Sequence, residues 1–90
     1  MRNYSDPEYK KWRKKIYARD KHQCQWPGCN RTKGLQAHHI LKWSEFPGLR
    51  YHPDNGITLC KDHHKLITND EDSYINFFNM LILNKKNETR

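Results

Sequence analysis

The chain lacks the material for a large hydrophobic core. Of its 90 residues, 34% are hydrophobic and 30% are charged, which is lean for a globular domain. A chain of this length buries only about 60% of its unfolded surface, so its fold is marginal without further reinforcement. It also has no run of the roughly 18 apolar residues that a membrane-spanning helix needs, and no apolar segment typical of a signal peptide. These absences predict one small cytoplasmic domain that stays out of the membrane.

Cysteine is scarce, and its number is odd. Three Cys would leave one thiol over in a framework of disulfides alone, which favours a reducing compartment. Cys24-x4-Cys29 is followed, thirty-one positions later, by Cys60-x2-His63, and two close pairs of soft ligands are what tetrahedral zinc requires. Such a site would reinforce the weak core, because structural zinc can contribute on the order of 10 kcal/mol to folding. The alternatives are that these are unmetallated thiols, or that His64 takes the place of His63.

Acidic residues are few compared with basic ones. Ten Asp and Glu stand against seventeen Lys and Arg, which gives a formal net charge of +7. A charge of this size on so small a body favours a polyanion as the partner. The alternative is that the charge only keeps the protein in solution.

A first helix is expected to begin near Pro7, because proline suits the first helical position and the residues before it can cap the helix. Tyr9, Trp12 and Ile16 then fall on one stripe, through which the helix can pack. The remaining surface is cationic and either contacts phosphates or is merely solvated. Its basic residues include Lys10, Lys11, Arg13, Lys14 and Arg19.

The rest of the chain reads as a mixture of short strands and helices. Residues 41–56 form a long irregular segment, which in so small a domain is usually functional or disordered. A polar tail, residues 84–90, ends the chain. The other expected elements are a turn-rich knuckle at 22–33, strands at 35–40 and 57–60, and helices at 61–67 and about 70–83.

Six histidines are present, four of them in two adjacent pairs. Adjacent residues on a strand point to opposite faces, so His38 and His39 cannot share one task unless the strand ends there. One could then bind a metal ion while the other acts as a base, and His64 can lean back toward the strand end from the following helix. For any one histidine, a role without catalytic duty is the alternative. Asn55 before Gly56 is a common turn sequence, so a turn role competes with a functional one there.

Taken in order, these motifs resemble the HNH endonucleases, especially small stand-alone proteins of phages and prophages. The resemblance covers roughly residues 7–70, with only a loose match in the first helix. The segments that carry it are Cys24-x4-Cys29, Ala37-His38-His39-Ile40, Asn55-Gly56-Ile57-Thr58-Leu59-Cys60 and His63-His64.

The resemblance implies an α+β fold. Its centre is a small zinc-stapled ββα-metal finger, in which two antiparallel strands and a helix surround one divalent ion, with a flanking N-terminal helix and a C-terminal helix. A single HNH nuclease domain over residues 1–90 is expected, with a core of about residues 7–83.

The resemblance also implies a role for each motif residue. In that family the second residue of the histidine pair is the general base, which makes His39 the base and His38 a metal ligand. His64 is the second ligand of the catalytic ion, and the side chain of Asn55 holds the loop that orients the base. Thr68 stands where some relatives carry a further histidine, so water or phosphate must fill more of the coordination sphere.

The zinc site also departs from the family pattern, because zinc-bearing members often have four cysteines. Here His63 stands in the place of the last one. The implied structural zinc ligands are Cys24, Cys29, Cys60 and His63.

The implied activity is hydrolysis of a DNA phosphodiester bond by a histidine base and one Mg²⁺, Mn²⁺ or Ni²⁺ ion, leaving a 5′ phosphate. A non-catalytic zinc module that binds nucleic acid or protein is the alternative, but it has no use for the ordered histidine and asparagine set. A hydrolase that uses the stapling zinc fits poorly, because four protein ligands leave no open position.

DNA is the expected partner, and the chain is expected to be phage-encoded or to work in the cytoplasm of a bacterial host. So small a body covers little DNA, which favours a homodimer or a partner such as a phage packaging protein. The side chains expected to contact phosphates, with solvation as the alternative, are Lys10, Lys11, Arg13, Lys14, Lys42, Arg50 and His52.

Overall fold

The computed structural model describes residues 6–41 and 47–88. Helix α1 spans Pro7–Arg19, which confirms the expected start. The carboxylate of Asp6 accepts a hydrogen bond of 2.9 Å from the backbone N–H of Glu8 and so caps the helix. The chain leaves α1 through two residues with left-handed backbone angles, Lys21 at φ 57° and His22 at φ 56°. Within the described residues, no helix has both the length and the apolar character for crossing a membrane.

Strands β1 (Leu35–His39) and β2 (Gly56–Cys60) form a two-stranded antiparallel sheet, and each lies within one residue of its predicted bounds. His39 pairs with Gly56 at one end of the ladder. Helix α2 (Lys61–Ile67) follows β2 directly, so the second strand leads into the helix without a loop. This is the expected order of two strands and a helix.

Both outer edges of the sheet are bonded by side chains or backbone from the α1 region. At the β1 edge, the hydroxyl of Tyr17 donates to the carbonyl of Leu35 at 3.2 Å. At the β2 edge, the N–H of Thr58 donates to the carboxylate of Asp20 at 2.9 Å, and the N–H of Gln25 donates to the Thr58 carbonyl at 2.9 Å. These bonds satisfy strand groups that would otherwise have no partner in so narrow a sheet.

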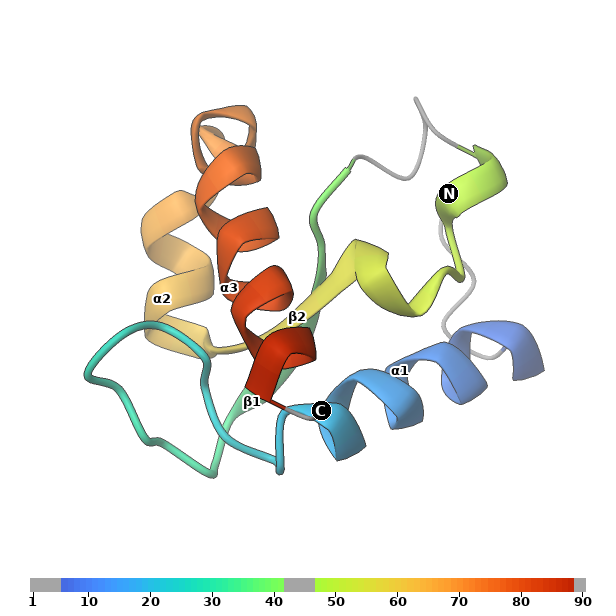
Figure 1. Cartoon of the computed structure of the whole chain (residues 1–90), viewed down its shortest axis with the longest axis horizontal. Coiled ribbons are helices and arrows are strands. Elements are labelled where there is room, and N and C mark those ends of the chain that lie inside the picture. Colours follow the sequence, from blue (N-terminus) through green and yellow to red (C-terminus); the bar gives the residue numbers. More distant parts are fainter. Residues whose placement is uncertain (1–5, 42–46, 89–90) are drawn as a thin grey trace.

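The sheet separates two small cores, with α1 on one face and α2 and α3 on the other (Figure 1). On the α1 face, Trp12 is 1% exposed and Ile16 is fully buried. Burial of such a side chain stabilises the fold by about 1.5–3 kcal/mol. The core on the other face is made of Cys24, Ile40, Ile57, Leu59, Cys60, Ile67, Phe78 and Ile82.

The expected final helix at about 70–83 is wrong in its bounds. A separate 3-10 turn spans Glu71–Tyr74, and helix α3 runs from Ile75 to Glu88. The hydroxyl of Ser73 donates to the carboxylate of Asp70 at 2.7 Å, a local bond that favours a tight turn over an α-helical start. The far end is longer because residues 84–88 continue the helix with lysine and glutamate, which are good helix formers.

The described part of the long segment between the strands contains two single turns of 3-10 helix, Pro47–Leu49 and Pro53–Asn55. Helix α1 holds this segment, because the indole N–H of Trp12 donates to the carbonyl of His52 at 3.0 Å. The described part of this segment is therefore bonded to α1, although its sequence shows no helical or strand periodicity.

Candidate metal centre and active site

Three cysteines and one histidine gather where the knuckle meets the start of α2. Their ligand atoms, the three thiols and one imidazole nitrogen, all lie within 4.8 Å of one another. The Nδ1 of His63 lies 3.2 Å from the Sγ of Cys60 and 3.6 Å from the Sγ of Cys24. On a tetrahedral zinc ion the ligand atoms lie roughly 3.5–3.8 Å apart. The set of Cys24, Cys29, Cys60 and His63 therefore fits zinc in both chemistry and spacing.

Local backbone geometry forms the knuckle that carries the first cysteine pair. The N–H of Cys29 donates to the carbonyl of Trp26 at 2.9 Å, which closes a tight turn between the two cysteines. The indole of Trp26 stacks on the ring of His63 with centroids 4.7 Å apart and planes 6° apart. This stacking fixes the plane of the imidazole, whose Nδ1 lies toward the thiols. His63, and not His64, is thus the histidine of the cluster.

The thiols of the cluster differ in their readiness to ionise. Burial raises the pKa of Cys24 to about 11. Burial also opposes ionisation of Cys60, but the backbone N–H of His63 and the thiol of Cys24, with smaller contributions, outweigh it and lower the pKa of Cys60. The N–H groups at the start of α2 thus favour a negatively charged ligand at Cys60.

The two histidines of the pair in β1 point to opposite faces of the sheet. His38 faces α2 and α3, where its ring lies 5.6 Å from the ring of His64 and 5.5 Å from that of Phe78. His39 faces α1, where its ring stacks on Trp12 with centroids 4.0 Å apart. Both are 5% exposed, whereas His64 is partly exposed. The structure thus brings His38 and His64 together and keeps His39 on the other side of the strand end.

The protonation of His39 follows from its hydrogen bond. Its Nε2 lies 2.8 Å from the carbonyl oxygen of Arg50. Because a carbonyl can only accept, Nε2 carries the proton, and in the neutral ring Nδ1 carries the lone pair. Stacking on Trp12 and this bond together fix the plane and the tautomer of the imidazole.

Asn55 clamps the long segment to the end of β1. Its Oδ1 accepts from the N–H of Leu41 at 2.7 Å, and its amide nitrogen donates to the carbonyls of Leu49 and Leu41 at 3.1 and 3.3 Å. It is 6% exposed. It does not have the left-handed backbone that its place before glycine suggested, because its backbone is a 3-10 turn. The side chain of Asn55 makes all three of these bonds.

A groove of about 320 Å³ runs along the outer edge of β1, between α1 and α2. The ring of Tyr9 lines it and lies 6.5 Å from the ring of His39. Arg13 and Tyr17 line it from α1, and His64 lines it from α2. Burial raises the pKa of Tyr17, although Arg13 and a backbone bond at Ala37 oppose the shift. The groove therefore brings aromatic, basic and imidazole side chains together on one surface.

Two further hollows are lined by cationic side chains. The larger, of about 550 Å³, is lined by α1 and contains all four basic residues of α1 that were expected to contact DNA. The other, of about 450 Å³, lies beside the knuckle and is lined by Arg31, Lys33 and Lys61 among others. The sequence did not indicate this second hollow, because Lys61 lies far along the chain from Arg31 and Lys33 and only the fold brings them together. The four basic residues of the larger hollow are Lys10, Lys11, Arg13 and Lys14.

The remaining residues expected to contact DNA do not line these two hollows. The Nδ1 of His52 accepts from the N–H of Asp54 at 3.0 Å, so this ring caps the second 3-10 turn. Arg50 is half-buried, and its carbonyl holds His39. Lys42 lies outside the described residues.

A two-stranded antiparallel ribbon that leads directly into a helix, with a Cys3His cluster beside it, defines a small α+β domain of the ββα-metal class. Comparison with family models agrees, since residues 20–71 match the family described as HNH endonuclease. This is more than half of the chain, and the chain belongs to that family. The loose resemblance in α1 falls outside the match. No curated protein and no solved structure shows a significant match.

Proposed function

We propose that this protein is a metal-dependent DNA endonuclease in which His39 is the general base and His38 and His64 hold the catalytic divalent ion. The family makes nuclease activity on nucleic acid the expected function. The observation that carries the finer proposal is the division of the histidines. One buried imidazole is held in a defined tautomer on one side of the strand end, and two facing imidazoles lie on the other.

His39 would take a proton from the attacking water through Nδ1. The bond from Nε2–H to the Arg50 carbonyl stabilises the ring as it becomes positively charged, because a carbonyl oxygen also accepts from imidazolium. Asn55 would act indirectly, since it holds the segment that contains Arg50 against Leu41.

His38 and His64 are the residues that would hold the ion. Neutral imidazoles suit Ni²⁺, whereas Mg²⁺ and Mn²⁺ would depend more on water and phosphate oxygens. The chemistry that a divalent ion supplies in such a site is neutralisation of the phosphate charge and stabilisation of the departing oxygen. The Cys3His cluster would hold a separate zinc ion with a structural role, because its four ligands leave no position for substrate.

DNA would lie along the groove at the β1 edge, with its phosphates on the two cationic hollows. Arg13 is well placed for this, because it lines both the groove and the larger hollow. That residues 1–90 form a single domain stays a prediction. So does a homodimer or a phage packaging partner, either of which would widen the contact with DNA.

The first test is cleavage of supercoiled plasmid by the pure protein with Mg²⁺, Mn²⁺ or Ni²⁺, with and without chelator. Cleavage that depends on the metal is the expected result. If the protein binds DNA but cuts it with none of these ions, the function is that of a zinc-stabilised binding module instead.

The sharper test separates the two histidines of the pair. His39→Ala should abolish most cleavage while the protein still folds, binds DNA and takes up the catalytic ion, because a base is not a ligand. His39→Gln, which keeps an amide N–H able to donate, separates loss of the base from loss of packing. In His38→Ala the ion is held more weakly, so a higher metal concentration should restore part of the activity. His22→Asn is a suitable control, since it changes an exposed histidine and tolerates its positive φ. Cleavage by His39→Ala at the normal rate would refute the assignment.

A further inference from the structure

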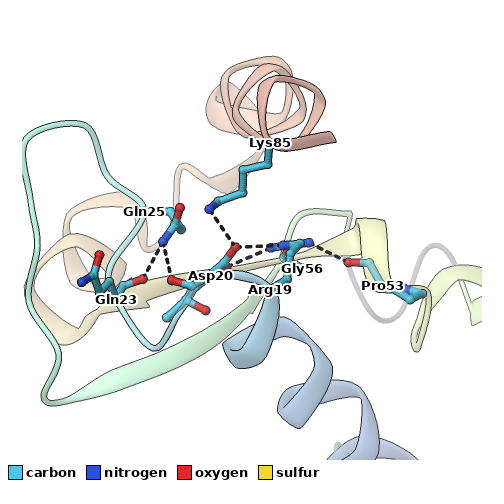
Figure 2. A network of polar contacts seen from close by, with 8 residues as sticks. Arg19, Asp20, Gln23, Gln25, Pro53, Gly56 and Lys85 are labelled. Atoms are coloured by element: carbon cyan, nitrogen blue, oxygen red, sulfur yellow. Dashed lines mark hydrogen bonds and ion pairs between the residues drawn. The ribbon is translucent and has the colours of Figure 1, made fainter. Parts of the chain in front are cut away.

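A buried carboxylate connects the three layers of the fold, which are α1, the sheet and the helices on the other face of the sheet. The side chain of Asp20 has no exposed surface and follows directly after α1. It accepts from the N–H of Thr58 in β2 at 2.9 Å, and Lys85 of α3 lies 3.8 Å away (Figure 2). Its main partner is Arg19, whose Nε and one terminal nitrogen donate to its two oxygens at 2.8 and 2.9 Å. A carboxylate this deeply buried needs these partners, because a buried charge left without its counter-ion strongly destabilises a fold.

Arg19 makes two further bonds that the ion pair does not require. Its terminal nitrogens donate to the carbonyl of Pro53 at 2.9 Å and to the carbonyl of Gly56 at 2.7 Å. Figure 2 shows the guanidinium lying between Asp20 on one side and these carbonyls on the other. Pro53 and Gly56 stand on either side of Asn55, so one side chain grips the backbone before and after the clamp residue.

This grip leads toward His39 through a series of hydrogen bonds. Asn55 is bonded to Leu41 beyond the end of β1 and to Leu49 in the first 3-10 turn. The next residue, Arg50, supplies the carbonyl that accepts from Nε2 of His39. The guanidinium of Arg19 thus holds one end of a short series of bonded residues. At the other end is the carbonyl that orients His39.

We propose that Arg19, oriented by Asp20, is a positioning residue for the nuclease site: it holds the backbone on both sides of Asn55 and thereby the carbonyl that orients His39. This inference rests on the proposed function, because it gives His39 the catalytic role. Among the described residues, Arg19 lines neither the groove nor the two cationic hollows. Its effect should therefore fall on turnover and not on DNA binding.

The test compares Arg19→Lys with Lys85→Gln. Lysine keeps a positive charge beside Asp20, but its compact ammonium cannot reproduce the planar fork that bonds the carboxylate and two carbonyls together. Lys85→Gln removes the other cation near Asp20 and leaves both carbonyl bonds in place. We expect Arg19→Lys to lower kcat roughly tenfold or more, as small misplacements of reacting groups do, with KM for plasmid unchanged. Lys85→Gln should keep kcat within about twofold. Equal losses in both variants, or normal kcat in a folded Arg19→Lys protein, would overturn the proposal.

Amide hydrogen exchange supplies a readout that needs no activity. The N–H of Leu41 reports on the Asn55 clamp, and the N–H of Thr58 reports on the Asp20 anchor. In Arg19→Lys, Leu41 should lose protection while Thr58 keeps it. Unchanged protection at Leu41 would refute the positioning role.

The two measurements also separate this inference from the proposed function. If the wild-type protein cuts no DNA, the proposed function fails, and the exchange at Leu41 still decides whether Arg19 positions the clamp. If Arg19→Lys does not fold, Asp20→Asn serves for both measurements. It retains an acceptor for Thr58 but loosens the hold on Arg19, so a loss at Leu41 with retained protection at Thr58 is again expected.

Discussion

Replacement of Gly56 by alanine should destabilise this protein strongly, for a reason visible only in the tertiary structure. Gly56 has an extended backbone, with φ −150° and ψ 152°, so any residue could adopt its conformation. A methyl group there would lie 2.4 Å from a ring carbon of Trp12 and 2.8 and 2.9 Å from two side-chain carbons of Ile16. All three approaches are closer than carbon atoms tolerate, and both neighbours are at most 1% exposed and cannot move into solvent.

The magnitude follows from the two opposing effects. Overpacking of this kind costs typically about 1–3 kcal/mol, and three close approaches to immobile side chains favour the upper end. Alanine also restricts the unfolded chain, and this effect stabilises the folded protein by about 0.4–1 kcal/mol. The net loss should be about 2 kcal/mol, and a loss of 1 kcal/mol lowers Tm by about 4–8 °C in a domain of this size. We expect Tm to fall by roughly 10 °C or more.

Gly48→Ala is the matched control. It makes the same chemical change at a glycine with no atom within 4 Å of the added carbon and no positive φ. Thermal melts of both variants at equal zinc concentration isolate the overlap, because the effect on the unfolded chain is shared. Plasmid cleavage should fall in Gly56→Ala as well, since Trp12 stacks on His39. A Tm for Gly56→Ala within about 2 °C of the control would refute the packing of α1 on the sheet.

Two further predictions concern the zinc cluster and the DNA surface. Cys60→Ser should abolish tight zinc binding and destabilise the fold; a folded protein without firmly held metal, or a variant with unchanged stability, would contradict the zinc assignment. Replacing three of the exposed lysines of α1 by glutamine should weaken DNA binding and flatten its salt dependence, whereas an unchanged slope would mean that these charges are only solvated. These lysines are Lys10, Lys11 and Lys14.

The features that could be predicted from the sequence are those that depend on neighbours along the chain. The start of α1 follows from the Asp6 cap and the following proline, and the order of two strands and a helix follows from short apolar runs and turn residues. The paired spacing of the cysteines and of His63 made the cluster predictable, because each pair closes its own short loop whatever the rest of the fold does. The predicted start of the final helix was wrong because a local hydrogen bond between Ser73 and Asp70 competes with the helical pattern.

The sequence by itself thus determined the family motifs, the strand and helix order and the cluster that zinc would fit. Only the tertiary structure decided how His38 and His39 divide between the two faces, because that depends on which helix covers each face of the sheet. It also decided the role of Asp20, since nothing local to an Arg-Asp pair indicates that a strand and a distant helix will enclose the carboxylate. The tertiary structure also decided the role of Gly56. The sequence around it suggests a turn, but the close approach of Trp12 is the physical reason that no side chain fits there.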